Sequence, residues 1–209
     1  MALYLAAAMH DHAHPGVNNT FLVTTRDPLA VLYNDRSVLE NHHASSAIKI
    51  LEENDFCSSL RQSEKIKLRF LIIECILATD LTCHNDVVNK FKSSLDQTNF
   101  SVDMDENFNR VLILKMLVKL ADISNVAKQP DLHFEWAEKL VIEFFSQGDK
   151  EVENNIPISK FMNREEPEVS NLQIGFIENI VTECCYKKCY VSIDIQNFCL
   201  RQLYDHWRF

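Results

Sequence analysis

The chain carries near its start the stretch His10-Asp11-His12-Ala13-His14-Pro15-Gly16. A helix through this stretch places His10 and His14 on one face, with Asp11 about 100° round the axis. Proline and glycine then end the helix, which leaves these side chains at an end that a cleft can reach. Imidazole nitrogen and carboxylate oxygen suit a divalent metal such as zinc, and a carboxylate can bridge to a second ion. Taken alone, the stretch fits a polar helix end with solvent-facing histidines equally well.

The composition around this stretch predicts an all-α protein. The 209 residues include only 3 glycines and 5 prolines against 46% apolar residues, which favours long helices over turn-rich β structure. No long run alternates with a period of two, and we find no internal repeat. A chain of this length fits one or two domains and can bury a real core.

Capping signals place the expected helices. Ser37 and Glu40 have the spacing of a capping box, and Gly148 stands where a helix is expected to end. One expected helix has a core stripe at helical spacing made of Ile66, Phe70, Ile73 and Leu77. The expected helices are residues 28–32, 37–53, 63–77, 107–122, 131–147 and one that Ser170 opens, with a polar loop at 93–106.

The net charge and the cysteines limit the partners and the cellular compartment that we expect for this protein. A net charge of -9 with no basic stripe argues against nucleic acid as a partner. The 7 cysteines are odd in number and lack paired C-x-x-C spacing, so we expect reduced thiols and a cytoplasmic protein. Residues 1–9 are apolar but too short to span a bilayer and have no basic leader; we expect them to form the buried stem of the helix that carries His10. No stretch reaches transmembrane length, and the oligomeric state stays open.

Six short sequence blocks follow one another in order over residues 4 to 181. They are His10-Asp11-x-x-His14-Pro15-Gly16-x-x-Asn19-x-Phe21, residues 33–43, Ala78-Thr79-Asp80 with His84, Ala121-Asp122-Ile123-Ser124-Asn125, residues 144–151 and Gln173-Ile174-Gly175-Phe176-Ile177. Together the six blocks resemble the class I 3′,5′-cyclic-nucleotide phosphodiesterases. Small details at 114–117 and 161–164 are similar to the cGMP-specific type-nine branch of that family.

The resemblance implies an all-α, compact multi-helix catalytic domain of the HD type. It implies a partial domain over residues 1–181, without its N-terminal helices, followed by a divergent tail at 182–209. The implied activity is metal-dependent hydrolysis of cyclic GMP or cyclic AMP to the 5′-monophosphate, in cyclic-nucleotide signalling. The implied cofactors are two divalent metals, zinc together with magnesium or manganese, and the implied partner is the cyclic nucleotide.

The resemblance also assigns the metal-binding residues. His10, Asp11 and Asp122 become metal ligands, with Asp11 bridging the two ions, and His14 becomes a catalytic group that contacts metal-bound water or phosphate. Asp122 lies far from the others in sequence, so this site requires a fold that brings two helices together. The alternative for Asp122 is an ordinary acidic residue at a helix end.

Two further residues are implied to orient water on the second ion, Glu40 and Thr79. Glu40 has an alternative role in its own capping box, and Thr79 has an alternative hydrogen bond to its own backbone. We interpret His43 and His84 as structural histidines rather than catalytic ones.

The implied nucleotide-binding residues are Asn125, Gln173 and Phe176. The amide of Gln173 is expected to hydrogen-bond the purine edge while the ring of Phe176 stacks on its face, both from one side of a helix. Trp136 is expected to line the same pocket. The alternative is that Gln173 belongs to a capping box opened by Ser170.

The chain also departs from the family pattern. A His-Asn-x-x-His motif that the family places upstream, with one zinc ligand and the general acid, does not occur before His10, and Ala13 replaces a common acidic residue. Loss of a general acid typically costs about 10²- to 10⁴-fold in rate. The alternative function is therefore a catalytically impaired fragment that acts as a nucleotide- or partner-binding helical module. A general metal phosphohydrolase fits less well, because Gln173 and Phe176 would be unexplained.

The tail from residue 182 contains a separate group of candidate metal ligands. Its cysteines and one histidine could suggest a metal site, but their spacings fit no common zinc pattern, so we expect a divergent end. These residues are Cys184, Cys185, Cys189, Cys199 and His206.

Overall fold

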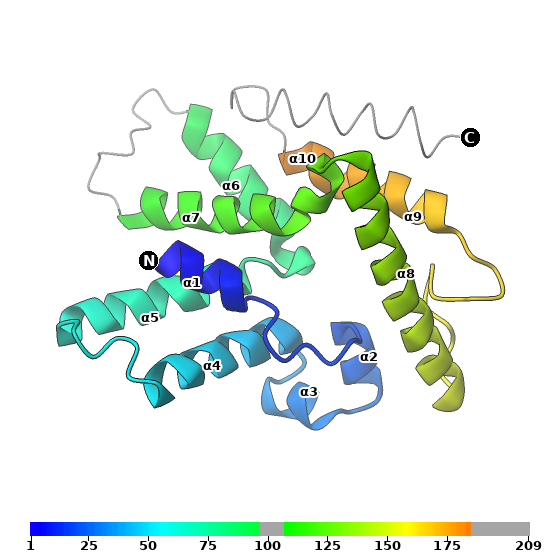
Figure 1. Ribbon diagram of the computed structural model, residues 1–209, viewed down its shortest axis with the longest axis horizontal. Coiled ribbons are helices and arrows are strands. Elements are labelled where there is room, and N and C mark those ends of the chain that lie inside the picture. The colour runs from blue at the N-terminus through cyan, green and yellow to red at the C-terminus, as the bar shows by residue number, and fades with distance from the viewer. Residues whose placement is uncertain (97–106, 185–209) are drawn as a thin grey trace. The chain divides into compact units, whose positions relative to one another are not determined.

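The computed structural model describes residues 1–96 and 107–184, and all regular structure in those ranges is helical (Figure 1). This confirms the all-α prediction. The chain divides into two compact units, Met1–Asp122 and the residues from Ile123 onward, and each is described by itself. The elements of the first unit are α1 (Ala2–Met9), α2 (Asn19–Thr24), α3 (Pro28–Leu32), α4 (Val38–Glu53), α5 (Gln62–Leu77), the 3₁₀ turn η1 (Leu81–Cys83), α6 (His84–Asp96) and α7 (Asn107–Asp122).

In the first unit, α1 packs between α5 and α7, while α4 packs on α5 and α6 packs on α7 (Figure 1). Several core positions are alanines, which let the helix backbones approach closely. Larger aliphatic side chains from α5 and α7 fill the remaining space. The core includes Ala6, Ala44, Ala47, Leu68, Ile72, Cys75, Ile76 and Val118.

The predicted core stripe of α5 is wrong for Ile66 and Phe70, whereas Ile73 packs against the core. Ile66 is 61% exposed and Phe70 is 51% exposed, whereas Ile72 and Ile76 are fully buried. The helix is apolar around most of its circumference, so periodicity alone cannot select the inward face. The selection is made by α1, α4 and α7, which pack against the face that carries Ile72.

The start of the chain also differs from the expectation. α1 ends at Met9, and Ala13 takes a left-handed backbone conformation with φ of 60°. His14 therefore does not lie on a helix face shared with His10. The buried-stem prediction holds for Ala2 and Ala6, but Tyr4 is 79% exposed.

The capping box predicted at Ser37 does not form. Ser37 has a left-handed φ of 43°, and its hydroxyl donates a hydrogen bond to Oδ2 of Asp80 at 2.6 Å. The backbone N–H of Leu39 instead donates to Oδ1 of Asn19 at 2.8 Å. The first turn of α4 is thus capped by a residue from α2 rather than by its own serine.

A buried lysine joins the C-terminal half of α7 to the end of α5. Lys119 is almost fully buried, and its Nζ donates to the carbonyl oxygen of Ala78 at 2.7 Å. Burial of an ammonium group is costly without such an acceptor, so this contact favours one placement of α7. Asp122, the last residue of α7, is positioned by the same packing.

The second unit contains the 3₁₀ helix η2 (Ile123–Ala127), α8 (Pro130–Glu153), α9 (Val169–Phe176), the π-helical turn η3 (Ile177–Val181) and α10 (Thr182–Cys184). The prediction that Gly148 ends a helix is wrong, because α8 runs through it. A Cβ at Gly148 would lie 1.9 Å from the carbonyl oxygen of Met162. Glycine is present here because backbone packs directly on the helix.

A buried carboxylate fastens the segment after α8 to that helix. Glu151 accepts hydrogen bonds from Nε2 of Gln147 at 2.8 Å and from the backbone N–H and the hydroxyl of Ser159 at 2.6 and 2.7 Å. Arg164 forms an ion pair with Asp149. These contacts fold the chain back along α8 before α9 begins.

Some predictions fall at the edge of the described ranges. Residues 93–96 belong to α6 rather than to a loop, and residues 97–106 lie outside the described residues. Most of the predicted tail, including its cysteines after Cys184, also lies outside them. Among the described residues, Cys57, Cys75 and Cys83 form no disulfide bond. Across residues 1–96 and 107–184, no helix has the length and apolarity needed to cross a membrane.

Candidate metal centre

Three predicted metal ligands from opposite ends of the first unit come together. His10 follows α1, Asp11 is next in the chain, and Asp122 ends α7. Nε2 of His10 lies 3.1 Å from Oδ1 of Asp122 and 3.3 Å from Oδ2 of Asp11. One ligand atom from each residue lies within 4.8 Å of the others. One nitrogen and two carboxylate oxygens at this spacing fit a divalent cation.

The orientation of the His10 ring suits metal binding through Nε2. Its Nδ1 donates to the carbonyl oxygen of Ala7 at 2.9 Å, which leaves Nε2 facing the two carboxylates. Histidines that bind metals usually donate their second nitrogen in this way. Hydrogen bonds from Asp11 and then Asp122 outweigh burial and raise the pKa of His10 to about 11. Without an ion, a proton on Nε2 therefore occupies the point where the two carboxylates converge.

Asp11 is the most exposed of the three predicted ligands, with a side chain 64% exposed. Its hydrogen bond with His10 lowers the pKa of its carboxyl group below the usual value. Its second oxygen, Oδ1, lies 3.9 Å from Nε2 of His43. One oxygen thus faces His10 while the other faces a different part of the site, which is the arrangement that a bridging carboxylate needs.

His14 reaches this site through a stacking contact with His43. The two ring centroids lie 5.5 Å apart with an interplanar angle of 21°. His43 is buried, and its Nδ1 donates to the carbonyl oxygen of His12 at 2.8 Å. Burial lowers the pKa of His43. The sequence led us to interpret His43 as structural, yet it contacts both the backbone and the acid of the metal-binding stretch.

Glu40 lies in the same unit and is held by Asn19. Nδ2 of Asn19 donates to the two carboxylate oxygens of Glu40 at 3.0 and 3.4 Å. Burial raises the pKa of Glu40, and the negative charges of Asp80 and Asp11 add to that increase. Asn19 belongs to the first sequence block, but the sequence did not suggest a role for it.

Thr79 shows the alternative contact that the sequence left open. Its hydroxyl donates to the carbonyl oxygen of Ile76 at 2.7 Å. Asp80, which follows it, is buried and accepts from the hydroxyl of Ser37 and from the backbone N–H of Thr82 at 2.7 Å.

The predicted nucleotide-binding residues all belong to the second unit. Gln173 and Phe176 are three residues apart on α9, and Asn125 lies in η2. Gln173 is 1% exposed, and its Oε1 has no hydrogen-bond partner. The alternative capping box with Ser170 does not form, because α9 begins one residue earlier, after Glu168. Trp136 is mostly exposed.

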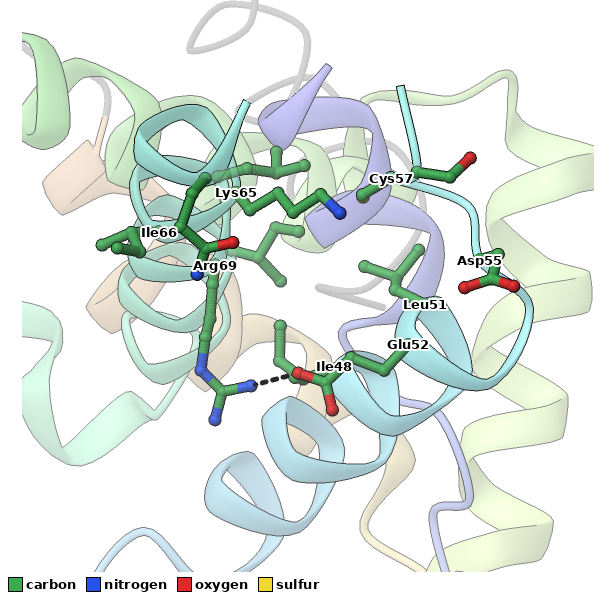
Figure 2. Close-up of a pocket in the computed structure, with 12 residues that line it drawn as sticks. Ile48, Leu51, Glu52, Asp55, Cys57, Lys65, Ile66 and Arg69 are labelled. Atoms are coloured by element: carbon green, nitrogen blue, oxygen red, sulfur yellow. Dashed lines mark hydrogen bonds and ion pairs between the residues drawn. The ribbon is translucent and has the colours of Figure 1, made fainter. Parts of the chain in front are cut away.

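A hollow of about 350 Å³ lies in the first unit, between α4 and α5 (Figure 2). Its floor includes Ile48 and Leu51, and the ion pair of Arg69 with Glu52 stands at its edge. None of the predicted site residues lines it. The hollow therefore does not coincide with the metal centre.

These observations define an all-helical protein in which His10, Asp11 and Asp122 form a group that could hold a metal ion. The 3′5′-cyclic nucleotide phosphodiesterase family model matches residues 1–203. The chain therefore belongs to the 3′,5′-cyclic nucleotide phosphodiesterase family. The match runs past residue 181, where the sequence predicts the start of a divergent tail.

Named relatives agree with this family. The chain is 49% identical over 189 residues to the rat cGMP-inhibited 3′,5′-cyclic phosphodiesterase 3A, which covers 89% of this chain and 16% of that protein. It is 40% identical over 215 residues to the probable 3′,5′-cyclic phosphodiesterase pde-3 of Caenorhabditis elegans, covering 99% of this chain and 31% of that one. The chain thus spans about a sixth to a third of the length of these relatives.

A solved structure shows the same fold. The phosphodiesterase domain of the Salpingoeca rosetta rhodopsin phosphodiesterase superposes with a TM-score of 0.91 at 31% identity, covering 98% of this chain and 64% of that one. A bovine dual specificity calcium/calmodulin-dependent 3′,5′-cyclic nucleotide phosphodiesterase 1B is 41% identical over 183 residues, 87% of this chain and 33% of that protein. With relatives named as types 3A and 1B, the predicted resemblance to the type-nine branch is not supported.

Proposed function

We propose that this protein hydrolyses 3′,5′-cyclic nucleotides to 5′-nucleoside monophosphates with the help of divalent metal ions. The observation that carries the proposal is the convergence of His10 and Asp11, which follow α1, with Asp122 at the end of α7. Family membership supplies the reaction class. The proposed location is the cytoplasm.

We propose zinc as the ion held by His10, Asp11 and Asp122, and magnesium or manganese as a second ion that shares Asp11. Nitrogen and oxygen donors fit zinc, and oxygen donors fit the harder second ion. When bound, such ions lower the pKa of a coordinated water and withdraw charge from a phosphoryl group.

The other residues of the first unit are proposed to orient groups around the metals. The ring of His14 stacks on that of His43, and Nδ1 of His43 donates a hydrogen bond to the carbonyl oxygen of His12. These contacts hold the two imidazole rings in place near Asp11. We propose that His14 contacts metal-bound water or the phosphate. We propose that the carboxylate of Glu40, which Asn19 holds, accepts hydrogen bonds from water on the second ion. Thr79 is proposed as a weaker member of this set, since its hydroxyl already donates to Ile76.

Gln173, Phe176 and Asn125 are proposed to bind the nucleotide. A buried amide oxygen without a partner is costly, and Oε1 of Gln173 is such an atom. A purine that donates a hydrogen bond to it would remove that cost. Phe176 projects from the same helix three residues later, where its ring can stack on a base.

A second candidate function is a nucleotide- or partner-binding helical module without turnover. Exposed apolar side chains favour it, because Tyr4, Ile66 and Phe70 are each more than half exposed in the first unit. Exposed apolar surface of this kind is typical of binding faces.

Hydrolysis of cyclic AMP and cyclic GMP by the purified protein, with zinc and magnesium added, tests the proposal. Asp122→Ala should abolish turnover, since it removes one of three ligands. Asp86→Ala, which removes an exposed acid in the first turn of α6, is the matched control and should keep wild-type turnover. A folded wild-type protein that binds either nucleotide without hydrolysing it would favour the second candidate function.

A further inference from the structure

Asn19 makes hydrogen bonds with two different groups at the start of α4. Its Oδ1 accepts from the backbone N–H of Leu39 at 2.8 Å, and its Nδ2 donates to the carboxylate of Glu40 at 3.0 Å. We propose that Asn19 is a positioning residue that fixes the Glu40 carboxylate beside the metal centre, by way of the turn that follows the metal-binding stretch. The inference rests on the function proposed above.

The contact is not needed to cap the helix on which Asn19 lies. Asn18 performs that task, because its Oδ1 accepts from the backbone N–H of Phe21 at 2.8 Å. Asn19 is the first residue of α2, and its side chain crosses to α4 instead. The two neighbouring asparagines therefore cap two different helices.

α4 depends on Asn19 because its own first residues cannot supply the cap. Ser37 is in a left-handed conformation, and its hydroxyl is committed to the buried carboxylate of Asp80. The N–H of Leu39 would otherwise be a buried donor without a partner, which costs about 1–3 kcal/mol. The cap fixes the distance between the start of α2 and the start of α4.

The second hydrogen bond acts on the direction of the Glu40 side chain. Glu40 is partly buried, and the negative charges of Asp80 and Asp11 repel its carboxylate, which raises its pKa. The amide NH₂ of Asn19 opposes this repulsion by donating to the carboxylate. A side chain with one acceptor and one donor, as in asparagine, satisfies both contacts together.

This arrangement connects the metal ligands to Glu40 through a short piece of chain. Gly16 makes a left-handed turn with φ of 69° directly after the metal-binding stretch, and α2 begins three residues later. The position of Asn19 is therefore set by the segment that holds His10 and Asp11. Through Asn19, the carboxylate of Glu40 takes its place relative to Asp11.

The variant Asn19→Asp tests the hydrogen bond with Glu40 apart from the one with Leu39. Aspartate keeps the acceptor for Leu39 but replaces the donor to Glu40 with a second carboxylate. The readout is the affinity of the zinc-loaded protein for Mn²⁺, measured by the electron paramagnetic resonance signal of the free ion. Loss of a group that orients a metal ligand or its water typically costs about 10- to 100-fold in affinity, and we expect a loss in that range. Unchanged Mn²⁺ affinity in a folded Asn19→Asp protein overturns the inference.

Asn18→Ala is the matched control, since it removes the cap of α2 at the neighbouring residue and leaves the hydrogen bonds to Glu40 in place. It should lower the melting temperature and leave the Mn²⁺ affinity at the wild-type value. An equal loss of Mn²⁺ affinity in Asn18→Ala would show that any weakened cap has this effect, and would overturn the inference.

A double variant tests whether Asn19 acts through Glu40. Glu40→Gln alone should lower Mn²⁺ affinity as Asn19→Asp does. In Asn19→Asp/Glu40→Gln the glutamine amide can donate to the new aspartate. The hydrogen bond between positions 19 and 40 is thereby restored with donor and acceptor exchanged, and we expect this variant to fold. Its Mn²⁺ affinity should equal that of Glu40→Gln, whereas a second full loss on top of the first overturns the inference.

The outcomes also separate this inference from the proposed function. A wild-type protein that binds Mn²⁺ and hydrolyses cyclic nucleotides, with the same affinity in Asn19→Asp, overturns the inference alone. A folded wild-type protein that neither binds Mn²⁺ nor hydrolyses cyclic nucleotides overturns both.

Discussion

Nε2 of His10 lies 3.1 Å from Oδ1 of Asp122, although 112 positions separate the two residues in the chain. α1 and α7 pack against each other and both pack against α5, which brings the end of α7 to the end of α1. The proposed metal ligand set is thereby completed by packing of alanine and aliphatic side chains rather than by a local motif. If these residues bind a metal as proposed, the stability of the core and the affinity for metal are linked.

Asp122→Asn should weaken the stabilisation that zinc gives to the fold. For the wild-type protein, free zinc at 100 times its dissociation constant adds about 2.7 kcal/mol to the free energy of unfolding. At the same zinc concentration, a variant with 100-fold weaker binding gains only about 0.4 kcal/mol. Thermal unfolding with and without zinc measures this difference. An equal zinc-induced shift in both proteins would show that Asp122 is not a ligand.

The raised pKa of His10 should depend on its two acidic neighbours in a fixed order. Asp11 contributes more to the increase than Asp122, so Asp11→Asn should lower the pKa of His10 further than Asp122→Asn does. Nitrogen-detected NMR titration of the metal-free protein measures both values. The opposite order would show that the Asp122 contact is the stronger one in solution.

The interaction of His10 with Asp11 and Asp122 should also make the free energy of unfolding depend on pH. The pKa of His10 is about 11 in the folded protein against an ordinary value near 6.5, so the charged ring is favoured by folding. This contribution is fully present below about pH 6.5 and is lost as the pH rises toward 11. In Asp11→Asn the loss should be smaller, which chemical denaturation of the metal-free protein at pH 6 and pH 9 can measure.

Gln173→Ala should raise KM for the cyclic nucleotide more than it lowers kcat. Loss of one hydrogen bond to the base corresponds to about 0.5–1.5 kcal/mol, or roughly 2- to 12-fold in KM. Asn171→Ala, an exposed position on the same helix, should leave KM unchanged. A variant of Gln173 that lowers kcat alone would contradict a role in base binding.

Gly148→Ala should destabilise the second unit, whereas Gly175→Ala should not. A Cβ at position 148 would lie 1.9 Å from a backbone oxygen of Met162, and overpacking of this kind costs about 1–3 kcal/mol. At position 175 the nearest atom is Nδ2 of Asn179 at 3.9 Å, so alanine fits there and removes a helical glycine. We expect a gain of about 0.5–1 kcal/mol at 175. Thermal unfolding of both variants makes the comparison, and equal melting temperatures would refute the close packing at 148.

Cys75 should be the slowest of the described thiols to react. Burial raises its pKa to about 11, so only ~0.1% is thiolate at pH 8. Cys57 is partly exposed and should be alkylated by iodoacetamide first, as peptide mass spectrometry of the native protein would show. Both should react alike once the protein is unfolded in urea. Early alkylation of native Cys75 would mean that the contact of α5 with α1 opens readily.

The sequence by itself determined the helical class, the His-Asp cluster at the end of α1 and the family. Each of these features can be read from composition or from short segments of the chain. The scarcity of glycine and proline favours helices, and each of the six blocks is a short run of residues. Sequence also singled out Asp122 through its block, although nothing local showed that it would meet His10.

Tertiary structure decided which apolar face of α5 is buried, because α5 offers apolar residues on most sides and its neighbours select the face carrying Ile72. It also decided that Asn19 rather than Ser37 caps α4, since a cap from another helix leaves no sequence spacing to detect. It let α8 continue through Gly148, because the glycine serves a backbone contact with Met162 rather than a helix end. In each case the deciding contact joins segments far apart in the chain, and helical periodicity carries no information about such contacts.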